Sequence, residues 1–256
     1  MQLLRGKRVL IFGVANYMSI AWAIARAFHD QGAELAITYV GEAQEKRVRP
    51  LAESLNSKFI IPCNVKSDEE IKALFSEISE IWDGLDIIIH AVAFAEKDEL
   101  KGSIINTSRE GFATAMDISV YSFLGIMKEA MPMMQGRNAA ALTLSYYGAV
   151  KVVPNYNIMG VAKAALEALV SYLAEALGPE GVRVNAISSG PIFTTSAFGV
   201  NGLSHALDKV AAKAPLRRNV TQDIVAQSAL YLCSDMARGV SGEIHYVDSG
   251  YNVIGM

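Results

Sequence analysis

The sequence predicts an α/β fold built on one doubly wound parallel sheet of seven strands. Short apolar runs recur along the chain, and each is followed by a longer stretch of helical character such as "DEEIKALFSEISEIW". The apolar runs are too continuous for half-exposed antiparallel strands, whereas the strands of a parallel sheet are buried on both faces. No Pro/Ser-rich linker, low-complexity tract or internal repeat divides the 256 residues. We therefore expect a single Rossmann-like domain over residues 1–256.

Each strand is predicted from its own apolar run. The seven runs are "RVLIFG" at 8–13, "ELAITYV" at 34–40, "FIIPCNV" at 59–65, "LDIIIHAVA" at 85–93, "AALTLS" at 140–145, "VRVNAIS" at 182–188 and "EIHYV" at 243–247. In such a sheet, ligands bind beyond the carboxyl ends of the strands. The residues that directly follow each run are therefore the candidates for a functional site.

Composition and charge argue against several classes of protein. The chain has 23 basic and 26 acidic residues, without the basic surplus of a nucleic-acid-binding domain. Its two cysteines and four histidines are scattered and show no zinc-ligand spacing, so we expect no metal. The N-terminal "MQLLRGKRVLIFGV" holds only a short apolar run, far below the about 18 residues of a membrane span. We expect a cytoplasmic protein that binds neither nucleic acid nor membrane.

The end of the first strand has some features of a dinucleotide site. Gly13 ends the strand, and Ser19 is a suitable N-cap for a helix from about Ile20 to Gln31. Free backbone N–H groups near Ser19 and Ile20 would face a pyrophosphate. Only the first glycine of the G-x-G-x-x-G fingerprint is present, so an ordinary strand–turn–helix is an equally good interpretation of this motif alone.

The ends of the second and third strands bear on the choice of cofactor. Val40 and Gly41 at the second strand end provide neither an acidic nor a basic side chain for the ribose. Glu42 favours NADH, while Lys46 and Arg47, a turn further on, are within reach of a 2′-phosphate, so NADPH stays open.

At the third strand end, Asn64 and Val65 are placed to flank an adenine, although a simple helix-entry turn explains them equally well.

Tyr156 and Lys163 lie in the stretch "YNIMGVAK", with six residues between them. If both are helical, they lie about 20° apart around the axis and about 10.5 Å apart along it. Gly160 lies between them on the same stripe, and the close approach of a ligand would explain a glycine there. Most such pairs have no shared function: the tyrosine ring is part of the core, and the lysine amine is exposed to solvent. Its place after the fifth strand favours a catalytic role.

Together these segments resemble the enoyl-acyl-carrier-protein reductases of the short-chain dehydrogenase superfamily over essentially the whole chain. The segments that carry the resemblance are "GVANYMSIAWAIA", "HAVAFA", "MDISVYSF", "LTLSYYGA", "PNYNIMGVAKAALEA", "GVRVNAISSGPI", "PLRRNVT" and "SGEIHYVDSGY". The resemblance implies NADH-dependent reduction of a trans-2-enoyl thioester, in the last step of the fatty-acid elongation cycle. Hydride would reach C3, and an enolate would develop at the thioester oxygen.

The resemblance also assigns roles to individual residues. It implies that Tyr156 is the catalytic tyrosine, that Lys163 binds the ribose and favours anionic character on Tyr156, and that Tyr146 closes the acyl site. Ala95 would contact the substrate with both tyrosines. The other implied cofactor contacts are Gly13, Ser19, Ile20, Val40, Asn64, Val65, Val92, Ile192, Phe193, Thr194, Thr195 and Ser196. A loop and helix at about 194–213 would fold over cofactor and acyl chain, and the enzyme would be a homotetramer.

The sequence departs from the family pattern at several positions. The family commonly has a polar or basic residue at Val40, an aspartate at Asn64 and an arginine at Phe193. Its loop often carries several basic residues that meet acyl carrier protein, whereas the first lysine of this loop is Lys209. Two other functions therefore stay open: a carbonyl or enone reductase acting on a coenzyme A-linked or free substrate, and a non-catalytic nucleotide-binding regulatory protein.

Overall fold

The computed structural model describes residues 2–194 and 203–255, and its centre is a seven-stranded sheet in the order β3-β2-β1-β4-β5-β6-β7. Every neighbouring pair is parallel. The strands are β1 (Arg8–Phe12), β2 (Glu34–Tyr39), β3 (Phe59–Pro62), β4 (Ile87–His90), β5 (Ala139–Tyr146), β6 (Val182–Ser189) and β7 (Ile244–Val247). Each lies within, or closely overlaps, one of the predicted apolar runs, so the predicted doubly wound α/β sheet is confirmed.

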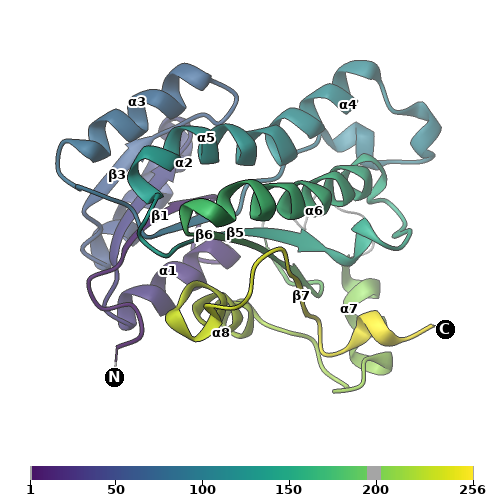
Figure 1. The fold of residues 1–256 in the computed structure, drawn as a ribbon. Helices are drawn as coiled ribbons and strands as arrows, with labels where there is room; N and C mark the ends of the chain where they lie inside the picture. Colours follow the sequence, from purple (N-terminus) through teal and green to yellow (C-terminus); the bar gives the residue numbers. More distant parts are fainter. Residues whose placement is uncertain (1, 195–202, 256) are drawn as a thin grey trace.

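Helices cover both faces of this sheet (Figure 1). They are α1 (Ile20–Asp30), α2 (Gly41–Ser54), α3 (Asp68–Ser79), α4 (Arg109–Met116), α5 (Ser122–Met134), α6 (Asn157–Leu177), α7 (Leu203–Lys213) and α8 (Gln222–Cys233). One hydrophobic core contains buried side chains of α1, α2 and α8, and the other contains those of α3, α5 and α6. Both cysteines are buried and free, and burial raises the pKa of each thiol to about 12.

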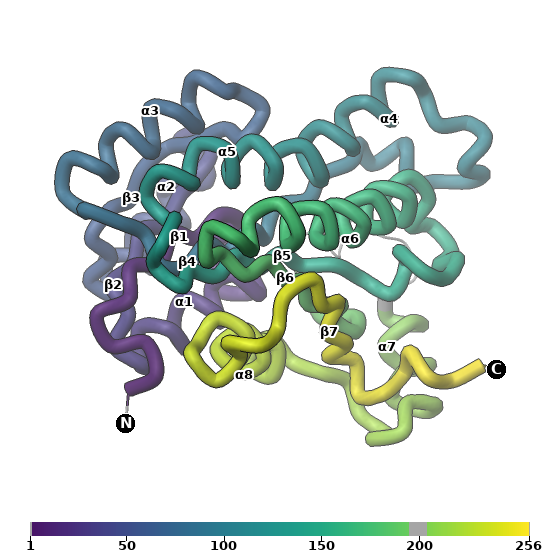
Figure 2. The backbone as a smooth tube through the Cα atoms, in the orientation of Figure 1, coloured from purple at the N-terminus to yellow at the C-terminus, as the bar shows by residue number. Residues whose placement is uncertain are grey.

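The sheet order reverses between β1 and β4, the two strands from which the chain winds in opposite directions. A crevice forms outside the carboxyl ends of such strands. Figure 2 lets the chain be followed from the N-terminus to α4 and α7, which lie toward the opposite end of the molecule. The sheet therefore has two edges: the carboxyl edge, where the strands end, and the amino edge, where they begin.

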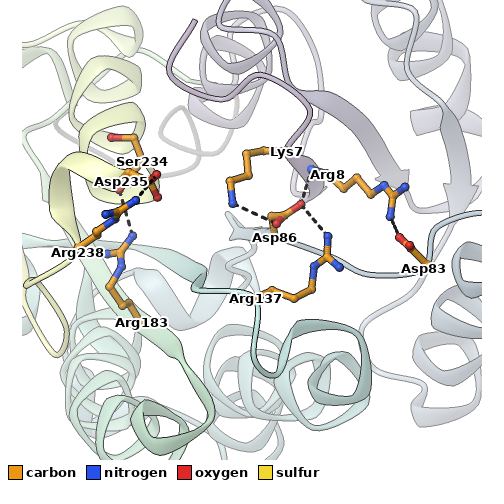
Figure 3. Close-up of polar contacts among 9 residues, drawn as sticks. All are labelled: Lys7, Arg8, Asp83, Asp86, Arg137, Arg183, Ser234, Asp235 and Arg238. Atoms are coloured by element: carbon orange, nitrogen blue, oxygen red, sulfur yellow. Dashed lines mark hydrogen bonds and ion pairs between the residues drawn. The ribbon is translucent and has the colours of Figure 1, made fainter.

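Charged side chains link neighbouring strands at the amino edge (Figure 3). Asp86, just before β4, is buried; its carboxylate accepts hydrogen bonds from Lys7 Nζ at 3.2 Å and from the Arg8 N–H at 3.0 Å. Arg137, just before β5, forms an ion pair with the same carboxylate at 3.6 Å. Arg8 also pairs with Asp83, and its guanidinium holds the pKa of that carboxyl below its usual value. These contacts fasten the beginnings of β1, β4 and β5 to one another.

Helix α6 is the longest helix in the described part of the chain. The segment Asn157–Glu180 is long and apolar enough to cross a membrane by length and composition alone. In the fold, however, Ile158, Leu166 and Val170 are buried, and α6 packs on β5 and β6. Its hydrophobicity is that of a helix lying against a sheet.

Candidate active site

Two of the predicted catalytic residues meet at the end of β5. Tyr146 is the last residue of this strand, and a short turn of 3₁₀ helix, Tyr147–Ala149, follows it. The ring of Tyr156 packs edge-on against the ring of Tyr146, with 5.0 Å between centroids and 70° between planes. The structure thus brings the two tyrosines together at the carboxyl edge.

Tyr156 does not lie within a helix, contrary to the geometry we assumed for the Tyr–Lys pair. It is the N-cap residue of α6, which begins at Asn157. The flanking Asn155 and Asn157 have positive φ angles of 60° and 37°, a conformation that asparagine tolerates better than most residues. The chain therefore turns sharply at "NYN", and the ideal helical spacing of the pair does not apply.

Gly160 packs closely against the protein's own backbone, which explains this glycine without a ligand; the approach of a ligand to it stays a prediction. A Cβ atom there would lie 2.9 Å from the carbonyl oxygen of Gly148, in the turn after β5. A Cβ on Gly148 would in turn lie 2.5 Å from the Tyr156 ring. The two glycines let the turn pack closely on α6 and set the place of the Tyr156 ring.

Lys163 is buried within α6 and donates a hydrogen bond from Nζ to the carbonyl oxygen of Leu144 at 2.7 Å. This contact ties the lysine to β5, two residues before Tyr146. Burial lowers the pKa of Lys163 to about 8, while the carboxylate of Glu167 acts in the opposite direction. The ammonium has three donors, so the contact to Leu144 leaves two for a ligand.

Burial raises the pKa of both predicted catalytic tyrosines above the ordinary value. For Tyr156 the proximity of Tyr146 raises the pKa further, and for Tyr146 a smaller contribution comes from Tyr251. The expected anionic character of Tyr156 is therefore not supported, since burial outweighs any help from Lys163. The phenol stays protonated at neutral pH and is a hydrogen-bond donor.

The loop after β4 closes one side of this cluster. Ser119, in a π-helical turn from Asp117 to Tyr121, accepts a hydrogen bond from the Phe94 N–H at 3.0 Å and donates one to its carbonyl oxygen at 3.2 Å. Val92 and Ala95 in the same loop are partly buried. Ala95 and Tyr156 pack against one small hydrophobic cluster, so the structure brings this predicted substrate residue to the tyrosine pair.

After β1, Gly13 and Ser19 make other contacts than the sequence predicted. Gly13 has φ of +97°, and a Cβ there would lie 2.1 Å from the Ala91 carbonyl oxygen, so neighbouring backbone requires this glycine. Ser19 is the N-cap of α1, but its hydroxyl accepts from the N–H groups of Ala15 and Asn16, and not from the helix. Its own N–H donates to the Asn16 carbonyl, so that group is not available as predicted.

The residues predicted to face the adenosine follow β2 and β3. Val40 is half exposed, and its N–H donates to Gln44, while Glu42, Lys46 and Arg47 lie along α2. At β3, the side-chain oxygen of Asn64 accepts from the Lys66 N–H at 3.1 Å, and Val65 is buried. Asn64 therefore forms a helix-entry turn, the alternative interpretation, and its placement toward an adenine stays a prediction.

Beyond β6, Ile192 is buried and Phe193 is 45% exposed. Both line a pocket of about 380 Å³ together with residues of α7 and of the loop before α8, among them Leu207 and Asn219. The predicted substrate helix is present as α7. Thr194 is described and partly buried, whereas Thr195 and Ser196 lie outside the described residues.

Three residues around the site were not predicted from the sequence: Gln222, Glu167 and Gly148. Gln222 Nε2 donates to the carbonyl oxygens of Met18 and Phe193, both at 3.0 Å, and so joins the loops after β1 and β6. Glu167 lies one turn beyond Lys163, a spacing that could have indicated it. Gly148 gave no signal, because its role depends on how the turn after β5 packs on α6.

Comparisons with known proteins show the family to which this chain belongs. A family model described as enoyl-(acyl carrier protein) reductase matches residues 13–252. The enoyl-[acyl-carrier-protein] reductase [NADH] of Aquifex aeolicus is 50% identical, covering 100% of this chain and 95% of the relative. Among solved structures, an enoyl-acyl-carrier-protein reductase of Anaplasma phagocytophilum in complex with NAD has a TM-score of 0.95, 50% identity, and covers 100% of this chain and 97% of the other.

A third relative was solved with the other dinucleotide. The enoyl-acyl carrier protein reductase of Bacillus cereus, with NADP+ and indole naphthyridinone, has a TM-score of 0.96 and 48% identity, and the two chains cover each other fully. The resemblance seen in the sequence thus extends to the family model, to full-length identity and to the fold. The chain belongs to the enoyl-(acyl-carrier-protein) reductase family.

Proposed function

We propose that this protein reduces the trans-2 double bond of an enoyl thioester with NADH. The observation that carries the proposal is the cluster at the end of β5. The ring of Tyr156 packs on that of Tyr146 at 5.0 Å, and Lys163 is anchored to Leu144 two residues earlier on the same strand. The names of the relatives support both the reaction and the cofactor.

The residues at the carboxyl edge fit a dinucleotide. Helix α1 begins at the switch point of the sheet, and its Ile20 N–H has no acceptor among the described residues, so it can face a phosphate. Lys163 has two donors left for ribose hydroxyls. Val92 and Ile192 follow β4 and β6, the strands on either side of β5. NADH would supply the hydride. Glu42 favours NADH over NADPH at the ribose.

The tyrosines would stabilise the negative charge that develops on the substrate. When hydride reaches C3 of the enoyl group, electron density moves to the thioester oxygen as an enolate. Tyr156, kept protonated by burial, donates a hydrogen bond to that oxygen. Tyr146 orients the Tyr156 ring and closes the acyl site. The reaction requires no covalent nucleophile.

The acyl group is proposed to arrive on acyl carrier protein. Acyl carrier protein is acidic, and four basic side chains on and just after α7 are available to bind it. Lys209 and Lys213 on α7, and Arg217 and Arg218 just after it, are exposed. Lys209 and Arg218 directly adjoin, in the sequence, Asp208 and Asn219, which line the pocket with Ile192 and Leu207.

The decisive assay is oxidation of NADH by a trans-2-enoyl thioester, measured side by side on acyl carrier protein and on coenzyme A, and repeated with NADPH. We expect turnover with NADH and a higher kcat/KM for the carrier-protein form. A preference for the coenzyme A form, or for free enones, would favour the alternative reductase. Binding of NADH without turnover of any thioester would favour a regulatory protein and contradict the proposal.

We also propose that the protein assembles as a homotetramer. Helices α4, α5 and α6 lie on one side of the sheet, and they leave large apolar side chains exposed: Phe112, Leu124, Val161 and Tyr172. Burial of such a surface against another copy would stabilise an oligomer. Light scattering after size-exclusion chromatography would give about four times the chain mass of 27.6 kDa, and a monomer would contradict this proposal. The single domain and the cytoplasmic location stay predictions.

A further inference from the structure

Glu167 lies directly behind the site, and the proposed reaction gives it no role. It is four residues beyond Lys163 on α6, so the two side chains share one face of the helix. Its Oε1 accepts a hydrogen bond from the Ser145 hydroxyl at 2.5 Å. Ser145 is buried on β5, between Leu144, which accepts from Lys163, and Tyr146. Three consecutive residues of β5 thus contact three groups of the site: Leu144 contacts Lys163, Ser145 contacts Glu167, and Tyr146 contacts the Tyr156 ring.

We propose that Glu167 is a positioning residue that keeps Lys163 protonated in its buried place, and that Ser145 holds the carboxylate there. The inference rests on the proposed function, since it assumes that the ammonium of Lys163 binds the cofactor ribose. Burial disfavours an ammonium, and a fixed negative charge nearby offsets this cost. A half-buried carboxylate held by a buried hydroxyl provides that charge without direct contact.

Neighbouring titratable groups do not provide an alternative charge. His90 on β4 interacts with Lys163, but burial lowers the pKa of His90 to about 3, so the imidazole is neutral near pH 7. Tyr246 on β7 interacts with Glu167, and burial and this carboxylate raise the pKa of Tyr246, so its phenol is neutral as well. Within the described part of the chain, Glu167 is the one charge that favours the protonated form of Lys163.

The shifts of the two groups agree with this arrangement. Burial lowers the pKa of Lys163 and raises that of Glu167, so each is driven toward its neutral form. The ammonium and the Ser145 hydroxyl both act to keep Glu167 ionised, as Glu167 acts to keep Lys163 protonated. Removal of the glutamate charge should therefore lower the pKa of Lys163 further, and the cation should be lost at a lower pH.

The experiment measures the dissociation constant of NADH against pH, from about pH 6 to about pH 10, by nicotinamide fluorescence. In the wild type, we expect affinity to weaken as pH rises past about 8, where Lys163 loses its proton. In Glu167→Gln, this alkaline limb should begin roughly one pH unit lower, because the negative charge that favours the ammonium is lost. In Ser145→Ala the carboxylate of Glu167 is no longer held and is screened by solvent. The pH at which affinity begins to weaken should therefore fall by less than in Glu167→Gln.

Glu175→Gln is the matched control, because it makes the same change at an exposed position of the same helix. Its limb should coincide with that of the wild type. An unmoved limb in a folded Glu167→Gln protein would overturn the proposal, as would an equal shift in Glu175→Gln. Should Glu167→Gln fail to fold, an unmoved limb in Ser145→Ala would overturn it.

Failure of the proposed function gives a different result. A wild type that binds NADH but reduces no enoyl thioester rejects the reductase, while a moved limb in Glu167→Gln still supports the charge pairing. A wild type that does not bind NADH overturns both. Measurement of kcat/KM for NADH against pH provides an independent second profile, in which the same downward shift is expected.

Discussion

Asp86, just before β4 at the amino edge of the sheet, and Lys163, on α6 beside the carboxyl edge, are both buried charges, but their surroundings differ. Asp86 is met by two cationic side chains and a backbone N–H. Lys163 is met by one carbonyl oxygen and, further away, by the carboxylate of Glu167, and its pKa falls to about 8. The first charge is fully satisfied by the fold, whereas the second retains donors for a ligand.

This difference separates stability from function in the molecule. A buried charge with direct partners holds the strands together, and its removal leaves other charges unpaired. A buried charge with few partners destabilises the fold somewhat but is poised to bind, as is common in active sites. Changes at the amino edge should therefore alter unfolding more than turnover, and changes at the carboxyl edge should do the reverse.

The largest expected effect is on stability, at Asp86. Asp86→Ala should lower the free energy of unfolding by about 4 kcal/mol, because Lys7 and Arg137 lose their shared partner. Urea denaturation followed by circular dichroism would measure it. Asp83→Ala is the control: its exposed partnership with Arg8 should contribute little. A strong loss of NADH affinity in folded Asp86→Ala would contradict the separation of the two edges.

Tyr156→Phe should slow reduction about 100-fold or more, since the enolate oxygen loses its hydrogen-bond donor. The ring contact to Tyr146 is kept, so the dissociation constant of NADH and the free energy of unfolding should stay close to those of the wild type. Single-turnover kinetics and NADH fluorescence would check this split. An unchanged rate of the chemical step would remove Tyr156 from the mechanism.

Lys163→Ala should weaken NADH binding about tenfold or more, because a charged donor to the ribose is lost. Stability should not fall as it does for Asp86→Ala, since burial of the ammonium already disfavours the folded state. Isothermal titration calorimetry would measure the affinity. Wild-type affinity in this variant would show the ribose assignment to be wrong.

The smallest expected effect concerns the buried His90 below the site. Its ring nitrogens contact Thr143 and Ser122 at 2.8 and 2.9 Å, and burial lowers its pKa to about 3. Below the ordinary histidine pKa of about 6.5, the unfolded chain takes up a proton that the folded protein does not, so stability falls as pH falls.

Between about pH 7 and about pH 5.5, this histidine should contribute a loss of about 1 kcal/mol. Comparison of the unfolding free energy of the wild type with that of His90→Gln isolates the contribution. The variant should lose about that much less stability over the same range. Equal losses in the two proteins would mean that His90 takes up its proton over the same pH range in the folded protein as in the unfolded chain.

Much of the fold was predictable because each buried parallel strand leaves its own apolar run. The same pattern predicted that a functional site would lie at the carboxyl ends of the strands, whereas Tyr146, Ile192 and Val92 were named by the resemblance to the reductase family. Sequence could not predict why Gly160 is a glycine, since the reason is the carbonyl of Gly148 in a turn that packs on it. Nor could it place Tyr156 outside α6, because two asparagines with positive φ decide where that helix begins.

The most direct test of the account follows the hydride itself. The protein would be incubated with a trans-2-enoyl thioester and NADH carrying deuterium at both C4 positions, and the product analysed by mass spectrometry and NMR. The account predicts a saturated acyl thioester with one deuterium at C3. Deuterium at the carbonyl carbon of an alcohol or aldehyde, or a product without deuterium, would contradict the assignment of the tyrosine pair to enoyl reduction.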